Sequence, residues 1–388
     1  MASAQGSPSP QTAKAPGPAT TPVRAAVVRD KGGPFAFEDL VLDTALRPDE
    51  VLVKVVAAGL CQTDLHVRDQ HLPTPLPAVL GHEGAGIVER VGDAVTTVAP
   101  GDRVVMSYQS CGRCTPCLTG SPAYCALSFP LNFGGSRIDG TNALHNGEEE
   151  IHGHFFGQSS FATHALATER NVVRIDDRDL PLELLAPLGC GLQTGAGAVL
   201  NSLTVEAGAS VVVIGAGTVG LSAVMAAKIA GASPVIAVDI VPERLALARE
   251  LGATHTIDGA HEDTAARIAD ITGGGADYVL EITARPDMLT LAVDALAPLG
   301  TAALIGGAPA GAHAPVNMNA LLGGRTLRGI AQGDSVPQLF IPRLIDLHRA
   351  GHFPFDRLIT LYDFDHINEA ADDTRTGAAI KPVLRIGE

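Results

Sequence analysis

A glycine-rich turn between two apolar runs constrains the fold of this chain most strongly. The apolar run at 210–214 leads directly into Gly215-Ala-Gly217-Thr-Val-Gly220, and an alanine-rich run follows at 219–229. The glycines of a G-x-G-x-x-G turn permit a tight turn, a close approach to a pyrophosphate, and close packing of helix against strand. The start of the helix also offers free N–H groups to phosphates. The segment therefore predicts a dinucleotide-binding βαβ unit.

The next apolar run ends in an acidic residue, Asp239, which lies 24 residues after Gly215. A carboxylate at this place accepts hydrogen bonds from the adenosine ribose hydroxyls and repels a 2′-phosphate, so the sequence favours NAD over NADP. Arg244 is assigned to the same ribose, and a solvated charge on a helix face is its alternative interpretation. Thr218 and Val219 complete the predicted cofactor turn. For the whole pattern, the alternative is a glycine-rich turn with an acidic helix cap.

The apolar runs divide the chain into two regions with different patterns of expected secondary structure. Between about 190 and 330 they alternate with helix-compatible segments, which predicts a parallel sheet with strands at 210–214, 235–238, 277–281 and 301–305 and helices at 219–229 and 242–251. Earlier in the chain, closely spaced β-like runs predict a mostly antiparallel domain, with strands at 23–29, 50–57, 83–90 and 102–107. The last stretch of the chain loses the alternation and is expected to return to that first domain.

Four cysteines lie within one short segment, with the spacing C-x2-C-x2-C-x7-C: Cys111, Cys114, Cys117 and Cys125. Four thiolates suit a tetrahedral site of four sulfurs, and zinc is the metal that we expect there. Disulfides are one alternative, but no secretion signal supports them. An iron–sulfur cluster is another, but the Cys-Pro element of a ferredoxin motif is missing. The segment 111–125 is therefore predicted to be a lobe that a structural zinc holds together.

Two further cysteines stand apart, Cys61 and Cys190, with Gly81-His82-Glu83 between them in the sequence. A lone cysteine is usually a small buried hydrophobe, and a lone histidine is usually a satisfied core or surface residue. Two thiolates, one imidazole and one open position together make a catalytic zinc site. This assignment rests on likeness to known sites of two cysteines and one histidine as well as on the residue types.

In these features the chain resembles the zinc-dependent medium-chain alcohol dehydrogenases, from about Val23 to the C-terminus. The His82 motif, the four-cysteine segment, Gly-Cys190-Gly and the turn at 215–220 occur in the family's order and approximate spacing. Within the family the chain is most like the aryl- or benzyl-alcohol branch and its terpenol relatives. The resemblance implies a zinc-dependent enzyme that transfers a hydride between a primary, aromatic or allylic alcohol and NAD+.

The fold that the resemblance implies is of the α/β class. A GroES-like, mostly β catalytic domain would span 23–191 and 331–388. It would be interrupted at 192–330 by a Rossmann domain, which is a doubly wound parallel sheet. Each chain would hold one catalytic and one structural zinc ion. The segment 125–155 keeps a long loop that dimeric members share, so the resemblance also implies a homodimer.

The resemblance carries roles over to individual residues. The catalytic zinc would bind Cys61, His82 and Cys190, with Asp64 orienting His82. Glu83 would sit close behind the metal. A proton relay would start at Thr63 and pass through the nicotinamide ribose to His66. Further cofactor contacts are expected at Thr194, Ile305 and Lys381. The alcohol pocket would be lined by Leu72, Ser107, Phe155 and Phe156, although both phenylalanines could instead be plain core residues.

Three positions depart from the family's pattern. Gln62 stands where many members carry a basic residue on the pyrophosphate, which predicts a weaker grip on the cofactor. Ser107 stands where many members carry a bulky aromatic residue, which predicts a wider pocket. Lys381 stands where some members carry arginine near the cofactor phosphates.

Composition excludes several kinds of partner. The net charge is −15, which argues against a nucleic-acid backbone or an anionic membrane surface as partner. The uncharged stretch before Arg325 is broken by glycine and proline, so a spanning helix is not expected. Residues 1–22 hold no Val, Leu, Ile or Phe and are predicted to be a disordered tail. Assigning all six cysteines to zinc as thiolates fits a reducing cytoplasm.

Two other functions compete with the leading one. A thiol-adduct formaldehyde dehydrogenase of the same family would need a cationic mouth for a charged thiol carrier, and no basic cluster is obvious apart from Arg68 and Arg137. A non-catalytic NAD- or zinc-binding relative would be free to lose the residues that bind the catalytic metal or move the proton. All of them are present, which disfavours that alternative.

Overall fold

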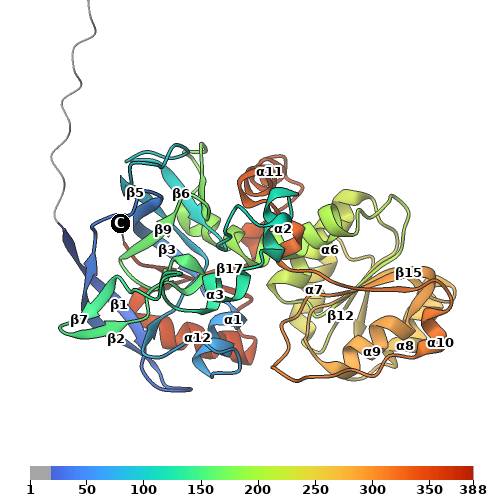
Figure 1. Cartoon of the computed structure of the whole chain (residues 1–388). Coiled ribbons are helices and arrows are strands. Elements are labelled where there is room, and N and C mark those ends of the chain that lie inside the picture. Colours follow the sequence, from blue (N-terminus) through green and yellow to red (C-terminus); the bar gives the residue numbers. More distant parts are fainter. Residues whose placement is uncertain (1–18, 388) are drawn as a thin grey trace, which may run out of the picture.

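The computed structural model describes residues 19–387, which form two lobes side by side (Figure 1). One lobe contains the first half of the chain and its C-terminal end, and the other contains the middle of the chain. Most of the predicted tail, 1–22, lies outside the described residues. Its last part is not a tail, because the first strand begins at Thr20 and residues 20–22 pair with 41–43. Backbone pairing supplies the stabilisation that the composition of this segment lacks.

The lobe with the first half of the chain and its C-terminal end is the predicted catalytic domain and is called the catalytic lobe below. It is built on two sheets that are antiparallel except for one parallel pair at the C-terminal end. The first sheet has the order β4-β1-β2-β7-β8, with β4 (Ala78–Val79), β1 (Thr20–Val28), β2 (Phe35–Asp43), β7 (Leu144–Asn146) and β8 (Glu149–Ile151). The second has the order β10-β6-β5-β3-β18-β17 with β9 also on β3, and comprises β10 (Val172–Arg174), β6 (Arg103–Met106), β5 (Gly84–Val91), β3 (Glu50–Gly59), β18 (Lys381–Arg385), β17 (Ile359–Asp363) and β9 (His164–Thr168).

The C-terminal segment completes this lobe, because β18 pairs antiparallel with β3. The last strand of the chain therefore lies in a sheet of the first lobe. The helices around the sheets are α1 (Gln62–Arg68), α2 (Thr115–Leu118), α3 (Ser128–Phe133), α4 (Leu182–Leu185), α5 (Gly191–Gly197), α11 (Pro337–Arg349) and α12 (Ile367–Thr376). Short single turns are η1 (Pro122–Tyr124), η2 (Phe155–Gly157), η3 (Ala186–Gly189), η4 (Ala198–Ser202), η5 (Gln332–Asp334), η6 (Phe355–Leu358) and η7 (Phe364–His366).

The second lobe is a six-stranded parallel sheet with the order β13-β12-β11-β14-β15-β16. Its strands are β11 (Val211–Ile214), β12 (Val235–Asp239), β13 (His255–Asp258), β14 (Ala276–Glu281), β15 (Leu296–Leu304) and β16 (Thr326–Gly329), and its helices are α6 (Thr218–Ala230), α7 (Pro242–Leu251), α8 (Thr264–Thr272), α9 (Pro286–Asp294) and α10 (Met318–Leu321). This is the Rossmann order, with the reversal of strand order between β11 and β14. The predicted α/β class, with a parallel sheet beside a mostly antiparallel domain, is confirmed.

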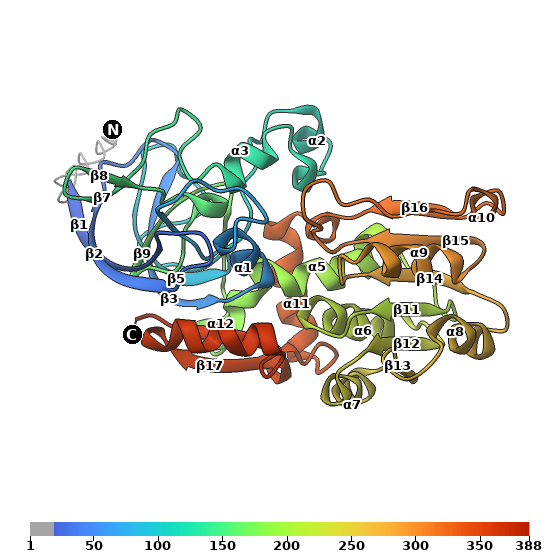
Figure 2. The same cartoon turned by 90° about the horizontal axis from the view of Figure 1, so that it is seen from below.

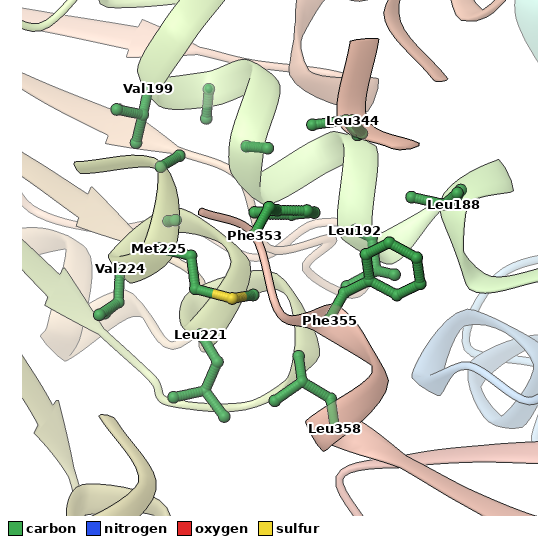
Figure 3. Close-up of a cluster of buried hydrophobic side chains, with 14 of the residues drawn as sticks. Leu188, Leu192, Val199, Leu221, Val224, Met225, Leu344, Phe353, Phe355 and Leu358 are labelled. Atoms are coloured by element: carbon green, nitrogen blue, oxygen red, sulfur yellow. The ribbon is translucent and has the colours of Figure 1, made fainter. Parts of the chain in front are cut away.

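A hydrophobic cluster joins the two lobes (Figure 3). Side chains from η3, α5 and η4 meet others from α6, α11, and η6 with the loop before it; the labelled members are Leu188, Leu192, Val199, Leu221, Val224, Met225, Leu344, Phe353, Phe355 and Leu358. Because these residues are buried together, the N-terminal helix of the Rossmann lobe is packed directly on the segment that leads out of the catalytic lobe. Among residues 19–387, none of the helices has both the length and the apolar character that a bilayer crossing requires.

Candidate active site

A buried carboxylate organises the first part of the site. Cys61 caps the N-terminus of α1, and Asp64 lies one turn into that helix with no exposed surface. The Asp64 carboxylate accepts three hydrogen bonds: from the Cys61 backbone N–H at 2.9 Å, from the Gly81 N–H at 3.1 Å, and from Nδ1 of His82 at 3.0 Å. The last bond fixes the imidazole so that Nε2 is the nitrogen left for a ligand.

Three of the predicted metal ligands converge at this point. Nε2 of His82 is buried and has no hydrogen-bond partner among the described residues. The ligand atoms of Cys61, His82, Glu83 and Cys190 all lie within 4.8 Å of one another. Two sulfurs and an imidazole nitrogen are the donors that zinc prefers, and an orphaned buried nitrogen beside them fits a metal. These residues would hold the catalytic zinc that the sequence predicts.

The loop that carries Cys190 is anchored on both sides. Leu188 and Leu192 flank the cysteine and are fully buried in the interlobe cluster, where Figure 3 shows them pointing among the side chains of α11 and η6. Cys190 itself lies at the junction of η3 and α5. Rigid packing on either side holds its sulfur in place opposite Cys61.

Burial and mutual contact shift the pKa values of all three predicted ligands. A hydrogen bond from the Cys190 thiol lowers the pKa of Cys61 well below that of an ordinary thiol, and the charges of Lys381 and His82 act in the same direction against burial. The pKa of Cys190 is raised correspondingly, because it donates to Cys61 and is buried. Burial works against charge on His82, but Asp64 and Cys61 outweigh it and raise the pKa of the imidazole.

Glu83 and Lys381 form a buried ion pair directly behind the ligand cluster. Nζ of Lys381 donates to both carboxylate oxygens of Glu83, at 2.9 and 3.0 Å, and to the Leu60 carbonyl at 3.1 Å. An ammonium has three donors, and all three are used here. The structure thus gives Lys381 a role that the sequence did not predict, neutralising Glu83, and its contact with the cofactor phosphates stays a prediction.

Replacing Lys381 by methionine is expected to destabilise the fold by about 3–5 kcal/mol, because Glu83 would remain buried without its counter-charge. Both side chains are 2% exposed or less. Urea unfolding measures the effect. Arg385→Met on the same strand is the matched control, since Arg385 pairs with Asp363 in solvent and is worth about 1 kcal/mol at most. An equal loss in both variants would contradict the structural role of the buried pair.

Thr63 and His66 lie on the same face of α1, three residues apart. The Thr63 hydroxyl lies 3.8 Å from the Cys61 sulfur, so it borders the ligand cluster. His66 is half-buried, and its ring lies 5.8 Å from that of His71, which is exposed. Burial and the neighbouring His71 charge lower the pKa of His66. The helix thus leads from the ligand cluster towards solvent through groups that can carry a proton.

Aromatic rings form a wall beside His82. Phe156 lies 4.6 Å from the imidazole, centroid to centroid, and Phe155 lies 5.5 Å away in an edge-to-face arrangement. Phe133 packs against both, and Phe129 stacks on Phe133. Four of the eleven phenylalanines of a tryptophan-free chain therefore gather here. Phe155 and Phe156 are both buried core residues and both touch His82, and their place in the alcohol pocket stays a prediction.

Of the other two predicted pocket residues, Leu72 packs in an apolar cluster and Ser107 is held by hydrogen bonds. Leu72 packs against the same apolar cluster as Phe155 and Phe156. Ser107 is fully buried, and its hydroxyl donates to the Gly189 carbonyl at 2.7 Å while it accepts from Nε2 of Gln193. The Ser107 side chain is thus bonded to the segment of Cys190 rather than left free for an alcohol.

The predicted cofactor turn has the geometry that a dinucleotide needs. Gly215 has a φ of +101°, and a Cβ on Gly220 would lie 1.8 Å from the Gly215 carbonyl oxygen, so neither position accepts a side chain. Asp239 ends β12, and its carboxylate accepts from the Ala216 N–H at 2.6 Å. The Asp239 carboxylate therefore lies against the glycine turn, which is where a ribose-binding carboxylate is expected.

The remaining cofactor residues lie along the junction of the lobes. Thr218 begins α6, and its hydroxyl donates to the Ile380 carbonyl of the catalytic lobe at 2.8 Å. Thr194 is buried in α5, and Ile305 is half-buried directly after β15. Arg244 on α7 reaches across to Gly377, where an added Cβ would lie 3.0 Å from its guanidinium. Val219 follows Thr218 in α6, and Gln62 is exposed at the start of α1.

The four-cysteine segment forms a projecting lobe around α2 (Figure 2). Its sulfurs lie within 4.8 Å of one another, with separations of 3.4 Å for Cys114–Cys117, 3.9 Å for Cys114–Cys125 and 4.0 Å for Cys111–Cys117. A tetrahedron with Zn–S bonds of about 2.3 Å requires sulfurs about 3.8 Å apart. Backbone N–H groups lower the pKa of Cys111 to about 6. None of these thiols is in a disulfide.

Two amide side chains near the predicted ligands were not predicted from the sequence. Gln158 donates to the carbonyls of His82 and Ser107 and accepts from the Gly84 N–H. Gln332 approaches Cys190, with its Nε2 at 3.8 Å from the sulfur. A glutamine far away in the sequence carries no local pattern, so no motif could have identified either residue.

Comparison with known proteins agrees with this geometry. The family described as "Alcohol dehydrogenase GroES-like domain" matches residues 47–177, and "Zinc-binding dehydrogenase" matches residues 218–347. The chain is 50% identical to geraniol dehydrogenase from Castellaniella defragrans, over 93% of this chain and 97% of that protein.

Two solved structures resemble the chain over nearly its full length. An alcohol dehydrogenase zinc-binding domain protein from Burkholderia ambifaria is 56% identical, with a TM-score of 0.93 over 95% of this chain and all of the other. Benzyl alcohol dehydrogenase from Acinetobacter calcoaceticus is 50% identical, with a TM-score of 0.91 and the same coverage. Family matches to both lobes and these close relatives show that the chain belongs to the zinc-binding alcohol dehydrogenase family and is an alcohol oxidoreductase.

Proposed function

We propose that the chain is an NAD+-dependent dehydrogenase of primary alcohols that carry an aromatic or allylic group, with the aldehyde as product. The observation that carries the proposal is the convergence of Cys61, His82 and Cys190 beside a wall of phenylalanines. One zinc ion is proposed at this cluster and a second at the four cysteines of the projecting lobe. Two thiolates with an imidazole suit a catalytic ion, and four thiolates suit a structural one, so the two donor sets support this division.

Zinc held by these three residues would act as a Lewis acid towards a substrate oxygen, and the nicotinamide would accept the hydride. The residues of the chain position the reactants and move the proton. The Thr63 hydroxyl borders the cluster, so it can take the alcohol proton while it releases its own proton along the predicted relay towards His66. His66 is half-buried, and an imidazole that is neutral at physiological pH can take up that proton and pass it to solvent. Asp64 keeps the His82 ring in orientation.

Two observations support aromatic or allylic alcohols as the substrate class. The rings of Phe133, Phe155 and Phe156 offer flat apolar faces, which pack well against another π system. Two relatives with half of their residues identical are named for geraniol and for benzyl alcohol. The first is an allylic alcohol and the second an aromatic one, so both relatives fit the same chemistry.

The choice of NAD over NADP is supported by the carboxylate of Asp239 at the glycine turn. Asp239→Ser is expected to lower kcat/KM for NAD+ by about 10- to 100-fold, because a charged hydrogen-bond acceptor is lost. It is expected to raise kcat/KM for NADP+ by at least about tenfold, because repulsion of the 2′-phosphate is relieved. Steady-state kinetics with both cofactors measures the two effects.

Asp258→Ser is the matched control for this change. Asp258 pairs with Asp239 in the strand register at the same edge of the sheet, but its carboxylate is bonded to His261 and the Ala260 N–H. It should leave cofactor preference unaltered. An Asp239→Ser enzyme with the wild-type preference would contradict the assignment of NAD.

A thiol-adduct formaldehyde dehydrogenase receives no support from the two arginines that the sequence singled out. Arg137 is bonded to the buried Glu50, with Nε–Oε1 at 2.6 Å. Arg68 is bonded to Asp69 at 2.8 Å. Each guanidinium already has a carboxylate partner, so neither offers a free positive charge to an anionic thiol carrier.

The proposal includes a homodimer located in the cytoplasm. β16 is an edge strand of the Rossmann sheet (Figure 2), and all four of its residues are exposed. Large apolar side chains around it are exposed too, among them Leu299, Met318 and Leu322. An unpaired edge next to an apolar patch supports pairing with a second copy. Six cysteines without a disulfide support a reducing compartment.

The function is tested by following NADH formation from NAD+ with benzyl alcohol, geraniol, ethanol, and formaldehyde with a thiol. Turnover is expected on the first two alcohols without any thiol, and kcat/KM for ethanol is expected to be lower by about 100-fold or more, because little apolar surface is buried. Turnover that requires the thiol would move the protein to the formaldehyde branch. Activity on ethanol equal to that on benzyl alcohol would contradict the aromatic pocket.

A further inference from the structure

Gln332 places an amide next to a ligand sulfur, and the reaction chemistry described above gives it no role. This residue begins η5, shortly after the last strand of the Rossmann sheet. Its Nε2 donates to Sγ of Cys190 at 3.8 Å. Its Oε1 is buried and accepts no hydrogen bond from the described part of the chain. The amide nitrogen of Gln332 thus faces the sulfur, while its buried oxygen is left without a hydrogen bond.

The backbone that carries this amide is in an uncommon conformation. Gln332, Gly333 and Asp334 have successive φ values of +51°, +64° and +50°. The left-handed region is unfavourable for residues with a side chain, and such residues cluster at functional sites where the surroundings impose the conformation. Two of these three residues are not glycine, so the segment has to be held by its contacts.

Contacts from both lobes hold it. The Asp334 carboxylate binds the hydroxyl of Tyr124, in the four-cysteine lobe, and the guanidinium of Arg328, in β16. Ser335 Oγ lies 2.5 Å from the Gln332 carbonyl oxygen and 2.9 Å from Oε1 of Gln193. These bonds fix the direction in which the Gln332 side chain leaves the backbone.

Close packing around Gly333 also holds the turn in place. A Cβ on Gly333 would lie 2.5 Å from the carbonyl oxygen of Gln193, so the turn is pressed against α5. Asn201 donates to the Gly333 carbonyl at 3.3 Å. Since α5 begins directly after Cys190, the turn and the ligand are parts of one packed unit.

The chemistry of the ligand decides what the amide can do. A thiolate that binds a metal has no proton and can only accept hydrogen bonds, so Nε2 rather than Oε1 must face it. A hydrogen bond to a ligand atom withdraws electron density from that atom, and such outer contacts tune both affinity and activity. We propose that Gln332 is a positioning residue whose amide N–H bonds the Cys190 thiolate and makes the metal a stronger Lewis acid. The inference rests on the proposed function, in which Cys61, His82 and Cys190 hold zinc.

The test uses the cobalt-substituted enzyme, because sulfur-to-cobalt charge-transfer absorption reports the electron density on the ligand sulfurs. The spectrum of Cys61→Ser, which keeps the four-cysteine site, is subtracted so that the difference belongs to the catalytic cluster. Gln332→Met removes the amide at nearly constant volume. Gln332→Gly also removes it and relieves the left-handed backbone, so the test does not depend on the folding of the methionine variant. Gln338→Met, an exposed amide on α11, is the matched control.

Both Gln332 variants are expected to shift the charge-transfer band to longer wavelength and to lower kcat for benzyl alcohol by about tenfold or more. The control should change neither. An unshifted band in both Gln332 variants would overturn the inference and leave the proposed function intact. A wild-type spectrum identical to that of Cys61→Ser would instead show that no metal sits at the cluster, and both proposals would fall.

Discussion

Cys61→Ser and His82→Ala are each expected to lower kcat/KM for benzyl alcohol by about a thousandfold or more. A bound metal supplies several kcal/mol of stabilisation to the developing charge on a substrate oxygen, and each step of about 1.36 kcal/mol is a factor of ten. Both residues place their donor atoms in a buried cluster, where a missing ligand is not replaced by solvent without cost. The measurements are kcat/KM and the zinc content of the same preparation.

The zinc content separates this effect from general damage. Each variant should lose one zinc ion per chain and keep the other, because the four-cysteine lobe has its own separate set of ligands. His261→Ala changes an exposed histidine of the Rossmann lobe and should keep both ions and full activity. A variant that has lost the catalytic ion but retains a tenth of wild-type turnover would contradict the role of the cluster.

Cys114→Ser is expected to unfold the projecting lobe at 111–125 and to lower the midpoint of thermal unfolding. This lobe has little apolar core: α2 contributes no buried residue, and the buried side chains nearby are Pro122, Ala123 and Cys125. Zinc binding in such segments is worth about 10–16 kcal/mol in isolated peptides, so its loss exceeds anything that the lobe's packing can offset. Limited proteolysis locates the unfolded segment, and calorimetry gives the midpoint.

Thr115→Ser is the matched control for the lobe, since Thr115 is an exposed residue of the same helix. It should leave both the protease pattern and the midpoint unaltered. Through Tyr124 and Asp334 the lobe also touches η5, so Cys114→Ser should lower kcat in addition. A Cys114→Ser protein with wild-type zinc content and an intact lobe would contradict the structural site.

The parts of the fold that could be predicted are those with a repeating local signal. The helix at 242–251 begins at a proline and ends before a glycine, and the structure gives it the same bounds. The central strands β11 and β12 are continuous apolar runs, because both of their faces are covered. β2 (Phe35–Asp43) was not predicted: its charged and apolar residues mix because much of the strand is exposed or half-buried.

Within the site, the residues that could be predicted are those whose chemistry few residue types can perform. Metal ligands are recognisable because few residue types bind zinc, and the six cysteines had few other uses. The ion pair of Lys381 with Glu83 was not predicted, because burial of Glu83, a matter of tertiary packing, decides where the ammonium goes. Gln332 had no signal at all, since its role depends on a left-handed turn that brings two distant segments together.

The most direct test of the central claim is a single turnover of benzyl alcohol with NAD+ on one preparation in three states. Hydride transfer is followed at the absorbance of NADH before metal removal, after a chelator has stripped the catalytic ion, and after zinc has been returned. The account predicts a rapid burst, its loss in the stripped protein, and its full recovery with zinc. A burst of unchanged rate in the stripped protein would contradict zinc-dependent alcohol oxidation at Cys61, His82 and Cys190.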